Sequence, residues 1–315
     1  MNKPGIIVIT GPTATGKTAL GVHLAKKIDG EVVSADSMQV YKYMDIGTAK
    51  PAVDEMYDIP HHMIDIVPPW EDYSVARYVE DTTKCVDDII CRGKIPVLVG
   101  GTGLYIDSLL AGRSFTARGD ETQRKMLEIE YDRIGGENML TKLREIDPYS
   151  AAKLHANDKK RIVRAFEAFE SEGKTISQHD AETKNLPVKY NAIKFALTFS
   201  DRADLYLKIE RRVDDMISKG LVDEVCSLLE MGVTRSNTSM QAIGYKEISD
   251  IIINDPTRTT LNNAVEKIKM ESRRYAKRQL TWLRRDKDVK WLIQEGVPDI
   301  NKGVQMIMEL LHETK

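Results

Sequence analysis

The segment from Ile6 to Thr18, IIVITGPTATGKT, constrains this chain more than any other. Its consecutive Ile and Val residues predict a buried parallel strand, and the pattern G-x-x-x-x-G-K-T follows directly. Helical spacing begins next, with Leu20, Leu24 and Ile28 on one side. A strand, a glycine-rich loop and a helix in this order favour a phosphate-binding loop (P-loop) on an α/β fold over a chance glycine-rich turn.

The positions of this loop suit an anionic ligand. Gly11 and Gly16 let backbone N–H groups turn toward oxyanions, and the positive end of the following helix favours the same charge. Lys17 would supply a point charge, and the Thr18 hydroxyl is a candidate Mg²⁺ ligand. The pattern predicts phosphate without specifying ATP. The predicted phosphate-binding residues are Gly11, Thr13, Ala14, Thr15, Gly16, Lys17 and Thr18.

Bulk properties narrow the class of protein. The 315 residues, 42% hydrophobic and 30% charged, are enough for one large domain or two. No apolar run approaches the roughly 20 residues that span a bilayer, so we expect a cytoplasmic protein without membrane contact. Separately, we expect a monomer. The formal net charge of −2 means that any polyanion site must come from local clusters of cations.

A second short strand, Glu31 to Ser34, is predicted to end beside Asp36, where α/β sheets carry their ligand sites. Asp36 is a candidate base or ligand for a metal-bound water, and Gln39 a candidate for amide recognition of a flat polar partner. Asp36 is equally suited to capping a helix N-terminus, so both interpretations stay open.

His61 and His62 lie in an irregular segment, residues 41–69, and raise the question of a metal site. Adjacent residues point in different directions, and no acidic or cysteine partner has ligand spacing. We therefore expect hydrogen-bonded structural histidines.

The strand predicted from Lys94 to Val99 runs into GGTGLY. A P-loop nucleotide hydrolase would have its Walker-B aspartate at this point. The missing carboxylate weighs against an ordinary ATPase, and the glycines permit a second close backbone approach to a ligand. Thr102 is the one polar side chain that this stretch offers.

Strand patterns vanish between about residues 115 and 187, and helical patterns dominate. This change predicts an inserted all-helical domain. We expect an α/β fold with a P-loop-containing core, residues 1–114 and 189–315, a mostly parallel sheet flanked by helices, and the insertion at 115–188. Within it, NDKKRIVR (157–164) carries four cations, which by themselves favour a solvated helix face over an RNA contact.

Two later stretches are candidates for ligand contact. Arg212 lies at the edge of the apolar stripe of a predicted helix, residues 204–217, where phosphate contact and pairing with Asp214 or Asp215 are equally consistent. The densest basic stretch, residues 267–290, has Tyr275, Gln279 and Trp282 among its cations. Cations combined with aromatic and amide groups are typical of RNA-binding surfaces, because cations contact phosphates while aromatic and amide groups stack on and hydrogen-bond to bases.

Together these motifs resemble one family, the tRNA dimethylallyltransferases, and they cover most of the chain in the family's order. The matching stretches are GPTATGKT (Gly11 to Thr18), SADSMQVY (Ser34 to Tyr41), GGTGLY (Gly100 to Tyr105), NDKKRIVRAFE (Asn157 to Glu167), LKIERRVDDMI (Leu207 to Ile217), SMQAIGYKE (Ser239 to Glu247) and KRQLTWLRR (Lys277 to Arg285). The set is far more specific than the P-loop alone.

The resemblance implies transfer of a dimethylallyl group from dimethylallyl diphosphate to the N6 amine of adenosine 37, next to the tRNA anticodon. It implies that Asp36 is the general base, that Thr102 orients the target nucleotide, and that Arg212, or Arg211 beside it, contacts the diphosphate. It also implies Mg²⁺, and an insertion that grips the anticodon stem-loop. The implied tRNA-binding residues are Asp36, Ser37, Met38, Gln39, Thr102, Arg124, Lys160, Arg161, Ile162, Val163, Arg164, Gln241, Lys277, Arg278, Gln279 and Trp282.

Two other classes of protein remain open. A small-molecule or nucleoside kinase would carry the same P-loop and would bind ATP. An RNA-binding module with a structural P-loop would bind tRNA without turnover. Incorporation of a prenyl label into tRNA would distinguish the transferase from both.

Overall fold

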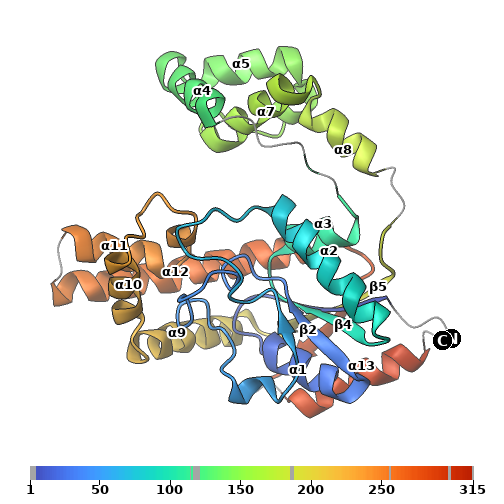
Figure 1. The fold of residues 1–315 in the computed structure, drawn as a ribbon. Coiled ribbons are helices and arrows are strands. Elements are labelled where there is room, and N and C mark those ends of the chain that lie inside the picture. The colour runs from blue at the N-terminus through green and yellow to red at the C-terminus, as the bar shows by residue number, and fades with distance from the viewer. Residues whose placement is uncertain are drawn as a thin grey trace. The chain divides into compact units, whose positions relative to one another are not determined.

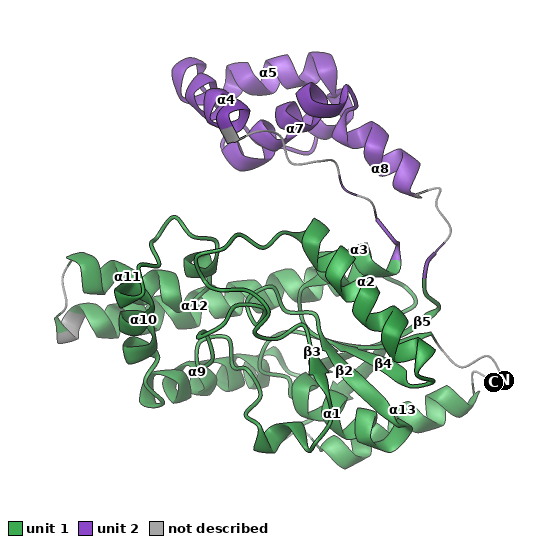
Figure 2. Ribbon diagram, in the orientation of Figure 1, with its two compact units in different colours: residues 1–110, 190–315 green, residues 111–189 purple. Residues whose placement is uncertain are grey.

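The structure of the chain, a computed structural model, describes residues 5–113, 115, 121–184, 188–254, 257–296 and 299–313. The chain divides into two compact units, one formed by residues 1–110 and 190–315 and the other by residues 111–189 (Figure 2). Residue 114, at the first predicted domain boundary, lies outside the described residues.

The larger unit is built on a six-stranded sheet with the order β3-β2-β4-β1-β5-β6. Its strands are β1 (Ile6–Thr10), β2 (Gly30–Ser34), β3 (His61–His62), β4 (Ile95–Val99), β5 (Ala192–Phe199) and β6 (Lys290–Gln294). All pairs of these strands run parallel, which confirms the predicted α/β core. The two-residue β3 was not predicted, because it lies in a segment without any strand pattern.

Helices cover both faces of this sheet, so the central strands are apolar on both sides (Figure 1). On one face, α1 (Lys17–Ile28) and α13 (Ile300–Glu313) pack with Leu20 and Ile307 against Ile7 of β1. On the other, Tyr78 of α2 (Val75–Cys91) donates to the Ser34 carbonyl at 3.0 Å. The same ring stacks on a tyrosine of α3 (Gly103–Leu110) with ring centroids 4.0 Å apart.

The remaining helices of this unit are α9 (Arg202–Ser218), α10 (Leu221–Glu230), α11 (Tyr245–Asn254) and α12 (Arg258–Leu283), with 3₁₀ turns η1 (Asp54–Met56) and η2 (Ser239–Gln241). The basic stretch therefore belongs mostly to one 26-residue helix, α12, which begins at a capping box between Thr257 and Thr260. Leu205 and Ile209 of α9 pack in one cluster with Ala276 of α12.

Helices are the only regular secondary structure among the described residues of the smaller unit. It contains α4 (Glu121–Ile134), α5 (Gly136–Ile146), α6 (Pro148–Ala151), α7 (Lys159–Glu172) and α8 (Ile176–Lys184). Leu127, Leu140, Leu143 and Phe166 belong to its separate apolar core. None of the described helices of either unit is both long and apolar enough to cross a membrane.

Candidate functional site

Because the strands are parallel, the loops that follow β1, β2 and β4 lie at one edge of the sheet. These three neighbouring strands lead into the P-loop, the Asp36 segment and the GGTG segment. The strand order, which the sequence does not reveal, therefore joins motifs that are far apart in the chain.

The P-loop is held in shape by its own residues. Gly11 has φ +145°, and a Cβ there would lie 2.6 Å from the Leu197 carbonyl oxygen, so glycine is required. Gly16, with φ 80°, is the N-cap of α1. The fully buried Thr15 donates its hydroxyl to the Pro12 carbonyl at 2.9 Å, so its side chain shapes the loop.

Lys17 and Thr18 lie where the P-loop enters α1, and both line a small cavity of about 60 Å³ and an outer one of about 820 Å³. Ala14 and Gly16 line the outer cavity as well. Burial, followed by the charge of Arg212, lowers the pKa of Lys17 to about 8 against an opposing effect of Asp36. A phosphate would relieve this crowding of two cations.

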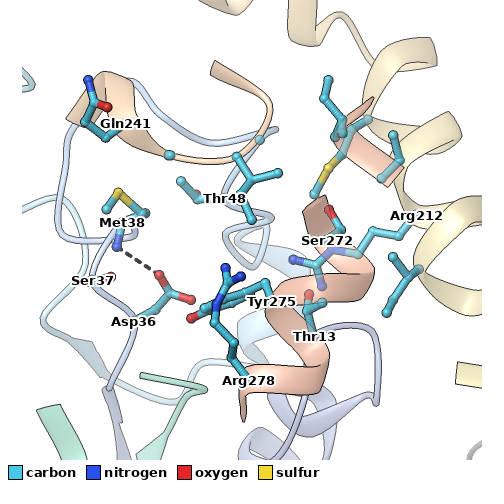
Figure 3. A pocket seen from close by; sticks show the side chains of 17 residues that line it. Thr13, Asp36, Ser37, Met38, Thr48, Arg212, Gln241, Ser272, Tyr275 and Arg278 are labelled. Carbon is cyan, nitrogen blue, oxygen red and sulfur yellow. Dashed lines mark hydrogen bonds between the residues drawn. The ribbon is translucent and has the colours of Figure 1, made fainter. Parts of the chain in front are cut away.

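Asp36 follows β2 in a turn. One carboxylate oxygen accepts a hydrogen bond of 2.9 Å from the Met38 N–H, so Asp36 caps this turn (Figure 3). The carboxylate also lines a cavity of about 290 Å³ together with Ser37 and Met38. No helix begins directly after Asp36 among the described residues, so Asp36 caps a turn and not a helix, and this role leaves it free to line the cavity.

Thr102 ties the GGTG segment to the turn of Asp36. Its hydroxyl accepts from the Ser37 N–H at 3.2 Å, and its own N–H donates to the Ala35 carbonyl at the same distance. Gly100 permits this approach, because a Cβ there would lie 2.2 Å from the Ala35 oxygen. These hydrogen bonds fix the position of Asp36.

The amide of Gln39 is engaged inside the protein. Its oxygen accepts from the Ser34 hydroxyl at 2.9 Å, and its nitrogen donates to the carbonyls of Thr48 and Ala49 at 3.3 Å. The side chain lines the cavity of about 60 Å³ beside Lys17. Through these hydrogen bonds Gln39 joins segments that line this cavity.

Arg212, on α9, extends into the site (Figure 3). It lines the cavities that Asp36 lines, and burial lowers its pKa while the charge of Asp36 raises it. Arg211 is exposed, and Asp214 pairs with Lys269 at 2.8 Å. Of the two adjacent arginines, Arg212 therefore faces the ligand cavities.

Gln279 connects two loops of the site. Its oxygen accepts from the Thr13 N–H at 3.0 Å, and its nitrogen donates to the Gly101 carbonyl at 2.9 Å. Trp282, one turn further along α12, donates its indole N–H to Asp107 at 2.9 Å. Both side chains, expected to contact tRNA, are occupied with internal hydrogen bonds here.

Exposed cations of α12 remain available to a ligand. Arg278 is exposed, lines the cavity of about 290 Å³ and lies over the Tyr275 ring at 5.6 Å. Lys277 is exposed beside it. Gln241 lines the same cavity, and its amide donates to the Arg235 carbonyl at 2.6 Å.

In the helical unit, the predicted RNA-binding run on α7 has two kinds of residue. Lys160 and Arg161 are exposed. Ile162 and Val163 are 0% and 1% exposed, so their side chains pack in the apolar core of the unit, and their expected part in the tRNA-binding segment stays a prediction. The charged residues of the run can still face solvent because helical periodicity separates them from the apolar stripe.

Two further arginines of this unit, both expected to contact tRNA, have acidic neighbours. The Arg164 guanidinium lies 3.1 Å from the buried carboxylate of Glu167. Arg124 lies 3.2 Å from Glu128, one turn along α4.

Three further side chains belong to the site or support it. Tyr275 lines two cavities beside Asp36, and burial raises the pKa of its phenol to about 12. His61 lines the cavity of about 60 Å³. Glu224 of α10 accepts from the backbone N–H groups of Asp45 and Ile46 at 2.8 Å. Tyr275 carried a sequence signal as an aromatic residue within the basic stretch, and His61 as one of two adjacent histidines, whereas nothing in the sequence marked Glu224.

Comparison with known proteins shows the family to which the chain is similar. The family model for IPP transferase matches residues 39–286, and that for isopentenyl transferase matches residues 4–65. The tRNA dimethylallyltransferase of Acetivibrio thermocellus is 47% identical over 91% of each chain. That of Carboxydothermus hydrogenoformans is 48% identical over 96% of each.

Solved structures give the same result. The tRNA isopentenylpyrophosphate transferase of Bacillus halodurans is 41% identical, with a TM-score of 0.72 over 99% of this chain and 98% of that one. A eukaryotic dimethylallyltransferase studied acting on tRNA is 30% identical, with a TM-score of 0.82 over 98% of this chain and 79% of that one. The chain therefore belongs to the IPP transferase family, the tRNA dimethylallyltransferases.

Proposed function

We propose that this prenyltransferase moves a dimethylallyl group from dimethylallyl diphosphate to the N6 amine of adenosine 37 in tRNA and releases diphosphate. One observation carries this proposal: Asp36 and Arg212 line both the cavity beside Lys17 and the larger cavity toward α12. Asp36 thus lies at the junction of an anion site and a second chamber. The comparisons do not support the alternative of a small-molecule or nucleoside kinase.

The reaction breaks the bond between the allylic carbon and the diphosphate oxygen, and forms a bond from that carbon to N6. The amine loses one proton, and Asp36 is the carboxylate in position to accept it. One carboxylate oxygen caps the turn through Met38, which fixes the direction of the other. Thr102 contributes by holding that turn, a role that differs from direct contact with the nucleotide.

Charge develops on the departing diphosphate, so groups that stabilise it accelerate the reaction. Lys17 and Arg212 line the same cavity, so the Lys17 ammonium and the Arg212 guanidinium are the charged groups available to the diphosphate there. The side chain of Arg212 stays charged near neutral pH even when partly buried, because its ordinary pKa is so high. These groups bind the diphosphate more strongly as its charge grows.

The residues present also fit Mg²⁺. In the described part of the chain no three His, Cys, Asp or Glu side chains form a group that could hold a metal. Mg²⁺ needs none, because it commonly binds substrate phosphates, one or two protein oxygens and several waters. Thr18 would supply the protein oxygen. His61 lines the same cavity, and its buried Nε2, which has no hydrogen-bond partner among the described residues, could accept from a water of the hydrated ion. Bound Mg²⁺ would neutralise diphosphate charge.

For tRNA, we propose that exposed cations position the anticodon stem-loop and that the target adenine leaves the base stack to reach Asp36. Lys277 and Arg278 of α12 and Lys160 and Arg161 of α7 are the exposed cations that support this proposal.

The test is transfer of label. The protein is mixed with an unmodified tRNA that has adenosines at the 3′ side of the anticodon, radiolabelled dimethylallyl diphosphate and Mg²⁺. We expect label in the tRNA, and none when the tRNA carries guanosine in place of adenosine 37. Absence of label in RNA, together with phosphate release from ATP, would favour a kinase or ATPase instead.

A further inference from the structure

The two adjacent histidines of β3 have different surroundings. His62 places Nε2 2.8 Å from a carboxylate oxygen of Glu31, which also pairs with Arg92. His61 turns away from this cluster, and its Nδ1 lies 2.7 Å from the Ile59 carbonyl oxygen. The expectation of hydrogen-bonded structural histidines is confirmed for His62 and for only one of the two nitrogens of His61.

The second nitrogen of His61 differs from the first. Nε2 of His61 is buried without a hydrogen-bond partner among the described residues. A buried polar atom left unpaired costs about 1–3 kcal/mol, so it is uncommon in a native structure unless a ligand or water completes it. The ring lines the small cavity that Lys17, Thr18 and Asp36 also line.

The partner of Nδ1 determines what Nε2 can bind. A carbonyl oxygen only accepts hydrogen bonds, so the proton of the neutral ring is on Nδ1 and Nε2 carries a lone pair. Burial lowers the pKa of the His61 imidazole, which favours this neutral form. Nε2 therefore accepts a hydrogen bond and is unsuited to direct contact with the oxygens of a diphosphate, which are acceptors too.

A water bound to Mg²⁺ is the donor that this position fits. Mg²⁺ keeps several of its waters when it binds a phosphate, and such waters are strong donors. We propose that Nε2 of His61 accepts a hydrogen bond from a water of the Mg²⁺–diphosphate complex at Thr18, which makes His61 a positioning residue of the diphosphate site. This inference rests on the proposed function.

The edge strand explains how the ring reaches this position. His61 pairs with Val32 and His62 with Val33 in the parallel register of β3 and β2. Successive residues of a strand point to opposite faces, so the two rings separate. The His62 ring lies in the polar cluster with Glu31, and the His61 ring lines the cavity beside the P-loop.

The test measures binding, not turnover. Inorganic diphosphate is titrated into the full chain by calorimetry, once with excess Mg²⁺ and once with a chelator. We expect His61→Leu to weaken binding in Mg²⁺ by about 10- to 100-fold, the usual effect of losing an outer contact to a metal, and to change binding in chelator little. His61→Gln, whose side-chain oxygen can accept near the position of Nε2, should recover most of the loss.

His62→Gln is the matched control, because His62 neighbours His61 and lines none of the described cavities near the P-loop. It should bind as the wild type does. Equal binding by wild type and His61→Leu in Mg²⁺, or an equal loss with and without Mg²⁺, would overturn the inference. Failure of the wild type itself to bind diphosphate would count against the proposed function instead. Circular dichroism of His61→Leu, together with recovered binding in His61→Gln, excludes misfolding as the cause of a loss in His61→Leu.

Discussion

The side-chain oxygen of Gln279 accepts a 3.0 Å hydrogen bond from the backbone N–H of Thr13, although the residues are 266 positions apart. The nitrogen of the same amide donates to Gly101, so α12 holds the P-loop and the GGTG segment together. Gln279→Leu leaves the N–H and the carbonyl without partners, at about 1–3 kcal/mol each. We expect KM for dimethylallyl diphosphate to rise about 10-fold or more, measured in steady-state transfer assays.

Lys277→Ala is the control for this prediction. Lys277 is exposed two residues earlier on the same helix, so its loss should weaken tRNA binding and leave KM for the diphosphate unchanged. The opposite pattern, with Gln279→Leu affecting only tRNA affinity, would show that Gln279 contacts RNA.

Asp36→Asn keeps an oxygen that can cap the turn at Met38 and removes the proton acceptor. General-base catalysis is worth about 10²–10⁴-fold, so kcat should fall by that factor while tRNA affinity stays nearly constant. Single-turnover transfer and filter binding measure the two quantities. An unchanged kcat would remove Asp36 from the role of base.

Lys17 predicts a pH dependence of diphosphate affinity. Burial and Arg212 lower its pKa to about 8, so the amine of the empty site is charged below that pH and becomes neutral above it. Diphosphate prefers the charged form, so affinity should be full below about pH 8 and fall as pH rises past it. Lys17→Arg should bind with a flatter profile, because arginine keeps its charge. A wild-type profile that is flat to about pH 10 would contradict this assignment.

Glu224 fixes the segment that faces the P-loop across the outer cavity. Its carboxylate accepts from the N–H groups of Asp45, Ile46 and Gly47, and Tyr245 donates its hydroxyl to the same group. Glu224→Ala should lower the free energy of unfolding by about 1–3 kcal/mol, measured by urea denaturation. Asp223→Ala, at an exposed neighbouring position, should change it little. Equal effects of the two substitutions would argue against a specific anchor.

The exposed cations of α7 should appear in the salt dependence of tRNA binding. Lys160→Ala or Arg161→Ala removes about one phosphate contact, so the slope of log affinity against log salt should flatten by about one unit or slightly less. Lys174→Ala is the control on the same unit, because Lys174 pairs with Glu182 at 2.9 Å. Slopes that remain as in the wild type would identify this face of α7 as merely solvated.

Local patterns were sufficient for most elements of the fold. The apolar run before Gly11 specifies a strand buried on both faces, and Gly11 and Gly16 specify a loop with positive φ, because glycine adopts that conformation without strain. The absence of a carboxylate after β4 is likewise visible in the sequence. By contrast, β3 has two residues and no period, so no local signal could predict it.

The sequence by itself determined the chemistry that the site has available: a phosphate loop, Asp36, an arginine pair and a basic helix. Tertiary structure decided which groups meet, because strand order and long-range hydrogen bonds join residues without any local relation. In the tertiary structure Arg212, and not Arg211, lines the ligand cavities, and Gln279 accepts a hydrogen bond from Thr13. Ile162 and Val163 are buried, and His61 and His62 have different surroundings. A sequence motif specifies which side chains are present, and tertiary packing determines which atoms each side chain contacts.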